Sequence, residues 1–121
     1  MQRIEAIIRP EKILDVKTAM ERLGHGGMTV TEVKGFGTQR GVMEEWQGSE
    51  FWIEFLPKIW FMVVVGDDDV EGVIEAICDN AATGEIGDGK IFISEIRDAV
   101  RVRTRERGAA ALTGGTPVTQ S

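Results

Sequence analysis

Residues 59–81 read IWFMVVVGDDDVEGVIEAICDNA, and this stretch decides the fold class. Its first seven residues are all apolar, which is typical of a buried strand. From Val70 onward, apolar residues recur at the spacing of an amphipathic helix, the best such pattern in the chain. The stretch therefore predicts a buried strand over 59–65 that leads directly into a helix.

Three aspartates, Asp67–Asp69, stand between the predicted strand and the predicted helix. Carboxylates at a helix N-terminus accept hydrogen bonds from free amides and interact favourably with the helix dipole. We predict that these side chains cap the helix. Magnesium binding is the alternative interpretation.

The rest of the chain supplies further strands and one more helix. Apolar and charged residues alternate over 4–8, after which Pro10 begins a helix that runs to a glycine stop at Gly24. Strands are predicted over 28–34 and 90–96, with a short fifth strand over 100–104. The order predicts an α+β fold, a ferredoxin-like βαββαβ sandwich with its helices on one sheet face.

The strand over 59–65 is apolar on both of its sides. One side carries Trp60, Met62 and Val64, and the other carries Phe61, Val63 and Val65. Because helices are expected to cover only one face, we predict that another subunit covers the other.

The domain is predicted to span residues 1–107, followed by a flexible C-terminal tail over 108–121 that is small and polar. A connection of about 20 residues between the second and third strands is far longer than usual, which is typical of a functional loop. We therefore predict an effector loop over 37–55. Its exposed aromatic residues suit contact with a protein partner.

The composition excludes several function classes. A net charge of −6 argues against nucleic-acid binding. One cysteine and one histidine cannot build a disulfide framework or a zinc cluster. The N-terminus has no apolar signal region and the longest apolar run is too short to cross a bilayer, so we expect a cytoplasmic protein.

Three segments suit the binding of an anion. The segment GEIGDGK at 84–90 has the spacing of a phosphate loop, but it lacks the Ser or Thr for magnesium and precedes a strand, which excludes a P-loop NTPase. Its glycines and lysine still suit a phosphate, and an ordinary helix-ending turn is the alternative. The other two segments are GFGTQRG at 35–41 and the alternating arginines Arg101, Arg103, Arg105 and Arg107, which an extended chain would project to one side.

No pairing of a nucleophile with a base is visible, so we expect a protein that is not an enzyme. A small acylphosphatase-like hydrolase would need a glycine cradle after the first strand, and Arg9 is followed by none. The segment KGFG at 34–37 resembles the opening of an RNA-recognition motif, but the aromatics that stack bases are missing and it ends the wrong strand.

Three segments resemble the PII signal-transduction family almost word for word: IEAIIRP at 4–10, GMTVTEVKGFG at 27–37 and TGEIGDGKIFI at 83–93. The resemblance covers roughly residues 1–107. It implies a homotrimer that binds ATP or ADP between subunits and, in some members, Mg²⁺ with 2-oxoglutarate. The implied partner is a regulated enzyme, a transcription factor or an ammonium transporter, and the loop over 37–55 would contact it. A transporter partner would also recruit the protein to the membrane.

The resemblance also implies which residues bind each ligand. The nucleotide would be bound by Ile7, Thr29, Gly35, Gly37, Thr38, Gln39, Val64, Gly87, Asp88, Gly89, Lys90, Arg101 and Arg103. 2-Oxoglutarate would be bound by Gln39, Arg40, Gly41, Lys58 and Gly87. Gln39 would help to hold Mg²⁺ together with ATP and the keto acid.

Some positions depart from the family pattern. Thr38 stands where relatives usually carry a basic residue that reaches the phosphates, and Trp60 and Met62 stand where charged residues are common. We therefore leave two functions open. The first is a non-enzymatic regulator of nitrogen and carbon metabolism that senses ATP, ADP and, with Mg-ATP, 2-oxoglutarate. The second is a specialised paralogue that senses mainly ATP and ADP and has a dedicated partner.

The loop departs further. Phe51 replaces the tyrosine that many bacterial relatives nucleotidylate, and the chain contains no tyrosine, which excludes that modification. Ser49 matches a serine that is phosphorylated in some cyanobacterial relatives, with an unmodified surface serine as the alternative. Gln47 replaces the basic residue that some relatives insert into a transporter pore, which predicts weak or absent plugging.

Overall fold

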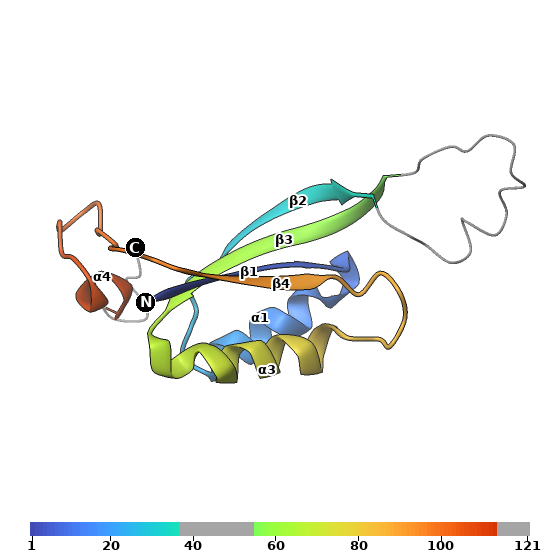
Figure 1. Ribbon diagram of the computed structural model, residues 1–121, viewed down its shortest axis with the longest axis horizontal. Helices are drawn as coiled ribbons and strands as arrows, with labels where there is room; N and C mark the ends of the chain where they lie inside the picture. Colours follow the sequence, from blue (N-terminus) through green and yellow to red (C-terminus); the bar gives the residue numbers. More distant parts are fainter. Residues whose placement is uncertain (37–54, 114–121) are drawn as a thin grey trace, which may run out of the picture.

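The computed structural model describes residues 1–36 and 55–113. These residues form a four-stranded antiparallel sheet with the strand order β2–β3–β1–β4 (Figure 1). The strands are β1 (Gln2–Ile8), β2 (Thr29–Gly35), β3 (Leu56–Val65) and β4 (Lys90–Glu95). The helices are α1 (Ile13–Arg22), α3 (Val70–Ala81) and a short α4 (Ala109–Thr113), and 3₁₀ turns η1 (Pro10–Lys12) and η2 (Asp67–Asp69) precede the first two. This arrangement confirms the predicted α+β, ferredoxin-like fold.

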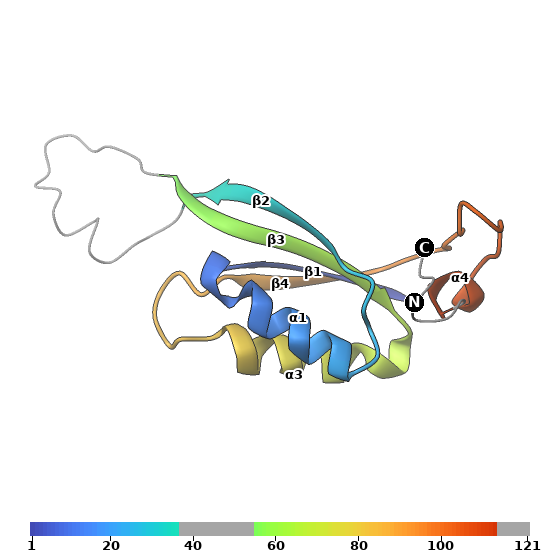
Figure 2. The same cartoon turned by 180° about the vertical axis from the view of Figure 1, so that it is seen from behind.

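The core lies between the sheet and the helices α1 and α3, which cover the same sheet face in both views (Figures 1 and 2). Strand and helix periods decide which side chains enter it. Each fully buried aliphatic or aromatic side chain contributes about 1.5–3 kcal/mol to folding. The largest fully buried side chains are Phe61, Ile4, Met20, Ile77, Val16, Val65 and Val73.

The predicted glycine stop after α1 is confirmed by its geometry. Gly24 has a φ of 90°, a conformation that glycine adopts without a Cβ penalty. The Gly24 N–H donates to the Glu21 carbonyl at 3.0 Å, and the His25 N–H donates to the Met20 carbonyl at 2.9 Å. This is the Schellman pattern, which satisfies two of the free carbonyls at the helix end.

The prediction that Asp67–Asp69 cap the helix is wrong, because no side-chain capping hydrogen bond is present at either η2 or α3. Instead, Asp67 Oδ1 accepts hydrogen bonds from the Met1 amino group at 3.0 Å and from Gln2 Nε2 at 3.1 Å. These hydrogen bonds, with that of the amino terminus foremost, hold the pKa of Asp67 below its ordinary value. The carboxylate therefore fastens the start of β1 to the start of the second helix.

The prediction of a fifth strand over 100–104 is also wrong. After β4 the chain folds back in a tight turn with a single bridge between Val100 and Arg107. Arg105 has a φ of 68°, and its N–H donates to the Arg101 carbonyl at 2.7 Å. The hydroxyl of Thr104 accepts the Glu106 N–H at 3.2 Å, a local bond that favours a turn over a strand. The four arginines therefore do not share one side of an extended chain.

Within the segment that composition assigns to a flexible tail, residues 109–113 form the short helix α4. Residues 114–121 and 37–54 lie outside the described residues. No helix within 1–36 and 55–113 has both the length and the apolar content needed to span a bilayer.

The second face of the sheet is not covered by any helix of the described residues (Figure 2). The strand register places Trp60, Met62 and Val64 there, and all three are only partly buried. Trp60 Nε1 donates to Glu5 Oε2 at 3.2 Å across this face, and Phe92 of β4 is 52% exposed. This open face has the composition of a surface that associates with protein, and the oligomeric state stays a prediction.

The core assignment predicts the effect of truncating Met20, which is completely buried on α1. Met20→Ala is expected to lower the free energy of unfolding by about 2–5 kcal/mol, because the lost side chain leaves a cavity. Leu14→Ala on the same helix, where the side chain is 71% exposed, is expected to cost less than about 1 kcal/mol. Chemical denaturation at one fixed protein concentration measures both values, and equal losses would contradict the assignment.

Candidate functional site

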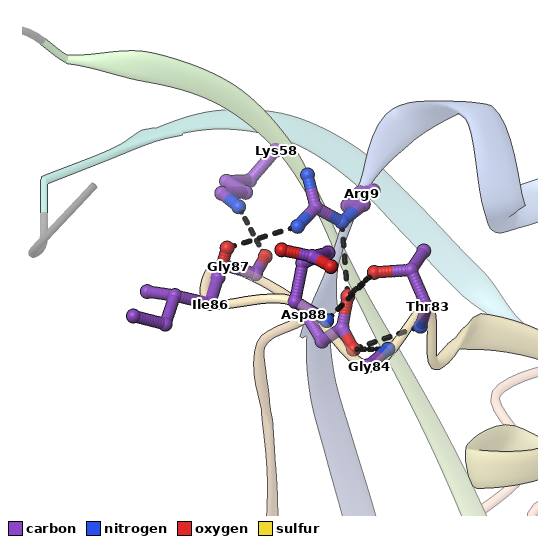
Figure 3. A network of polar contacts seen from close by, with 8 residues as sticks. Arg9, Lys58, Thr83, Gly84, Ile86, Gly87 and Asp88 are labelled. Carbon is purple, nitrogen blue, oxygen red and sulfur yellow. Dashed lines mark hydrogen bonds and ion pairs between the residues drawn. The ribbon is translucent and has the colours of Figure 1, made fainter. Parts of the chain in front are cut away.

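The glycine-rich turn over 82–89, between α3 and β4, is closed by the carboxylate of Asp88 (Figure 3). Asp88 Oδ2 accepts the backbone N–H groups of Thr83 at 2.8 Å and Gly84 at 2.9 Å. Asp88 Oδ1 accepts the Thr83 hydroxyl and, at 3.0 Å, Arg9 Nε. One side chain thus folds the turn on itself and ties it to the residue that follows β1.

The same contacts decide the charge of Asp88. The hydrogen bonds from Thr83, and after them those from Arg9 and Gly84, hold the pKa of Asp88 far below its ordinary range. Partial desolvation opposes them and is outweighed. The carboxylate is therefore ionised at neutral pH and acts as a fixed anion inside the turn.

Three glycines give the turn its backbone path. Gly84, Gly87 and Gly89 have φ values of 90°, 106° and 105°, which side-chain-bearing residues rarely adopt. A Cβ on Gly89 would also overlap the carbonyl oxygen of Ile7, so the turn lies directly against β1. Glycine at 89 is thus required both by conformation and by space.

Two cationic side chains donate hydrogen bonds to carbonyl groups of this turn (Figure 3). Lys58 Nζ, from β3, donates to the Gly87 carbonyl at 2.6 Å, and Arg9 Nη2 donates to the Ile86 carbonyl at 3.0 Å. Burial, and then the nearby Arg9 charge, lower the pKa of Lys58, while Glu11 and Asp88 oppose the shift. A carboxylate or phosphate that replaced these neutral carbonyls would form ion pairs with the two cations, in which donor and acceptor are both charged.

Several residues implied by the resemblance meet around this turn. Ile7 pairs with Lys90 across β1 and β4, and its carbonyl lies against Gly89. A Cβ added to Gly35 would lie 3.2 Å from Lys58 Cγ, so the Gly35 backbone lies beside the Lys58 side chain. The residues gathered at this end of the sheet are Ile7, Gly35, Lys58, Gly87, Asp88, Gly89 and Lys90.

Other implied residues lie elsewhere in the chain. Thr29 pairs with Met62 and Val64 pairs with Arg3, farther along the sheet from the turn. The segment after β4 that carries Arg101 and Arg103 lies at the opposite end of the sheet, beside α4 (Figure 1), and Arg101 Nη2 donates to the Ala110 carbonyl of that helix. Gly37, Thr38, Gln39, Arg40, Gly41 and Ser49 lie outside the described residues.

Sequence reasoning missed two members of the site, Arg9 and Thr83. The sequence assigns Arg9 no role in binding and indicates only that no glycine cradle follows it, whereas Arg9 binds Asp88 and the turn. The Thr-Gly start of the turn, five residues before Asp88, is a local signal for such a capped loop. The arginine carries no local signal, since 79 residues separate it from its carboxylate partner.

An apolar pocket of about 240 Å³ lies beside the turn, between α3 and β4. The residues that line it are Ile8, Ile77, Cys78, Ala81, Ala82, Asp88, Gly89, Lys90 and Ile91. It offers few polar groups and does not suit a phosphate. Within residues 1–36 and 55–113, no cluster of three or more His, Cys, Asp or Glu side chains could hold a metal.

The family model described as "Nitrogen regulatory protein P-II" matches residues 1–106. The chain belongs to the P-II family. The P-II protein of Mesorhizobium japonicum is 54% identical over 112 residues, which cover 93% of this chain and all of the relative. P-II 1 of Methanothermobacter thermautotrophicus is 48% identical over 93% of this chain and 97% of its own, and the P-II protein of Porphyra purpurea is 50% identical over 93% and 100%.

Membership confirms the resemblance drawn from the three sequence segments. It also confirms the prediction that the chain is not an enzyme, because the P-II family is a family of non-enzymatic regulators. The chain is thus a nitrogen regulatory signal-transduction protein at the level of its family.

The contact of Gly89 with β1 predicts two different costs for adding a methyl group to the turn. Gly84→Ala, at a φ of 90° with open space around the Cβ, is expected to cost about 1–2 kcal/mol of backbone strain. Gly89→Ala adds the overlap with Ile7 and is expected to cost at least about 3 kcal/mol. Denaturant unfolding compares the two, and a loss for Gly89→Ala no larger than for Gly84→Ala would contradict the packing.

The lowered pKa of Asp88 predicts how stability depends on pH. Its contribution is fully present above the ordinary aspartate value of about 4 and is lost as the pH falls toward its folded value. Asp88→Asn should therefore lower the melting temperature at about pH 7, and its deficit against the unsubstituted protein should shrink below about pH 4. Asp68→Asn, which changes an exposed carboxylate of η2, is the control, and a similar pH-dependent deficit there would contradict the assignment.

Proposed function

We propose that the chain is a homotrimeric, cytoplasmic sensor of ATP and ADP that also binds 2-oxoglutarate with Mg-ATP and controls partners through residues 37–55. The observation that carries this proposal is the hydrogen bond from Lys58 Nζ to the Gly87 carbonyl. It joins β3, which follows the long loop, to the glycine-rich turn that suits a phosphate. A ligand bound there acts directly on the end of the loop.

The nucleotide is proposed to bind against the turn at 87–90. Glycine backbone at two positive-φ positions there, Gly87 and Gly89, leaves room for close approach of a phosphate, and Lys90 supplies a positive charge. Thr29, Val64, Arg101 and Arg103 belong to the proposed site, yet they lie away from the turn of their own chain. In a trimer these residues come from the neighbouring subunit. The partly buried open face of the sheet supports such an assembly.

2-Oxoglutarate is proposed to pair its carboxylate with Lys58. The ammonium group binds a neutral carbonyl in the free chain, and its reduced exposure strengthens an interaction with an anion. Gln39, outside the described residues, is proposed to hold Mg²⁺ between ATP and the keto acid, with Arg40, Gly41 and backbone groups nearby. A ligand shifts the conformational equilibrium of the loop only as far as its affinities for the loop's conformations differ. We propose that 2-oxoglutarate and ADP favour different conformations of the loop.

The alternative is a specialised paralogue that responds mainly to ATP and ADP. One contact favours it: Trp60 donates to Glu5 on the open face at a position where relatives commonly carry charge. Met62 beside it is also uncharged, and both departures change the surroundings of a nucleotide bound there. This alternative keeps the trimer and the turn but gives 2-oxoglutarate little or no effect.

Isothermal titration calorimetry tests the proposal with ATP, ADP and 2-oxoglutarate in the presence of Mg²⁺. We expect 2-oxoglutarate to bind only with ATP, and Lys58→Gln to weaken that binding by about tenfold or more because a charge-assisted hydrogen bond is lost. Gln39→Ala should likewise weaken the binding of 2-oxoglutarate in the presence of Mg-ATP, because a proposed ligand of the bridging Mg²⁺ is lost. Lys17→Gln removes an equal charge from a helix surface and should change nothing.

Each failure has a distinct meaning. Nucleotide binding without any ATP-dependent binding of 2-oxoglutarate would leave the specialised paralogue. The absence of nucleotide binding would defeat both functions. A monomeric mass by light scattering would defeat the shared site. Affinity capture of partners with ATP plus 2-oxoglutarate, compared with ADP, then identifies the regulated enzyme, transcription factor or transporter.

A further inference from the structure

The guanidinium group of Arg101 is already occupied within its own chain. Arg101 Nη2 donates to the Ala110 carbonyl of α4 at 3.0 Å. Its Nε lies 3.2 Å from Glu106 Oε1, an ion pair that lacks the alignment of a hydrogen bond. The Arg101 side chain is only 12% exposed. A carboxylate and a helix carbonyl thus take the place that an external anion would need.

The carboxylate of Glu106 is itself held in position. The hydroxyl of Thr104 donates to Glu106 Oε1 at 2.8 Å and accepts the Glu106 N–H. The backbone adds a further link, since the Arg101 N–H donates to the Glu106 carbonyl at 2.9 Å. The short turn between the two residues therefore presents the carboxylate to the guanidinium without a long-range contact.

Arg103 provides an internal comparison. It lies in the same turn, is exposed, and makes no hydrogen bond or ion pair with other described residues. Arg103 is thus free to meet an anion, whereas Arg101 must first leave Glu106 and Ala110. The two arginines of one proposed site differ in their readiness to bind.

We propose that Glu106 and α4 form an intrachain latch that competes with nucleotide phosphate for Arg101. This inference rests on the proposed function, in which Arg101 is a phosphate ligand of the neighbouring subunit. A phosphate binds only the fraction of molecules in which the arginine is released, so the latch lowers the apparent affinity by that fraction. The C-terminal segment thereby tunes the nucleotide concentration to which the sensor responds.

The test is ATP and ADP binding to the full-length chain by isothermal titration calorimetry. Glu106→Gln keeps the size of the side chain and removes the charge, and it should tighten nucleotide binding by about three- to tenfold. Thr104→Val keeps the Glu106 charge but removes the hydroxyl that positions the carboxylate. It should also tighten nucleotide binding, by a smaller factor than Glu106→Gln. Glu75→Gln, on the exposed surface of α3, changes the net charge equally and should leave the affinity unchanged.

A double variant separates the latch from a general effect of charge. The Arg101→Ala variant should bind nucleotide more weakly. Adding Glu106→Gln to it should then leave the nucleotide affinity unchanged, because the guanidinium for which Glu106 and the phosphate compete is absent. Tightening that persists without Arg101 would overturn the latch, as would unchanged or weaker binding in Glu106→Gln. If Arg101→Ala binds nucleotide as well as the unsubstituted chain, the proposed role of Arg101 in the site fails instead.

Discussion

The carboxylate of Asp88 is the constraint on which the site depends. It accepts hydrogen bonds from Thr83 and Gly84 at the start of its own turn and from Arg9 after β1, so one carboxylate holds the two ends of the turn and the end of β1 together. Glycines make this possible, because only a chain without a Cβ at Gly89 can pass so close to β1. The turn is therefore shaped before any ligand arrives, and its ordering cost is met during folding.

That preshaped turn is joined to the residue after β1 through Arg9 and to β3 through Lys58. Lys58 reaches from β3 to the Gly87 carbonyl, and β3 begins directly after the long connection from β2. A structural change at the turn is thus transmitted to the end of that connection through the flexible side chain of Lys58. The sheet supplies rigidity, and Lys58 supplies a contact with two available partners, a carbonyl in the free chain or an anion in a complex.

The fold could be predicted from sequence because its elements carry local signals: the short apolar run of β3 favours a buried strand, and the helical spacing of α3 gives that helix one apolar face. The failures have a common cause. The alternation of valine and arginine from residue 100 has the period of a strand, but the local sequence does not show whether a partner strand lies beside it. Asp67 and Asp88 find partners 66 and 79 residues away, and no single sequence reveals such pairs.

The hydrogen bond between the Met1 amino group and Asp67 makes the first residue part of the folded structure. The Met1 carbonyl also accepts the Ile96 N–H at 3.1 Å, just beyond the end of β4. Any fusion at the amino terminus converts a charged amine into a neutral amide and extends the chain where the first strand, the last strand and a helix start converge. A comparison of protein with and without an amino-terminal fusion therefore reports on that junction directly.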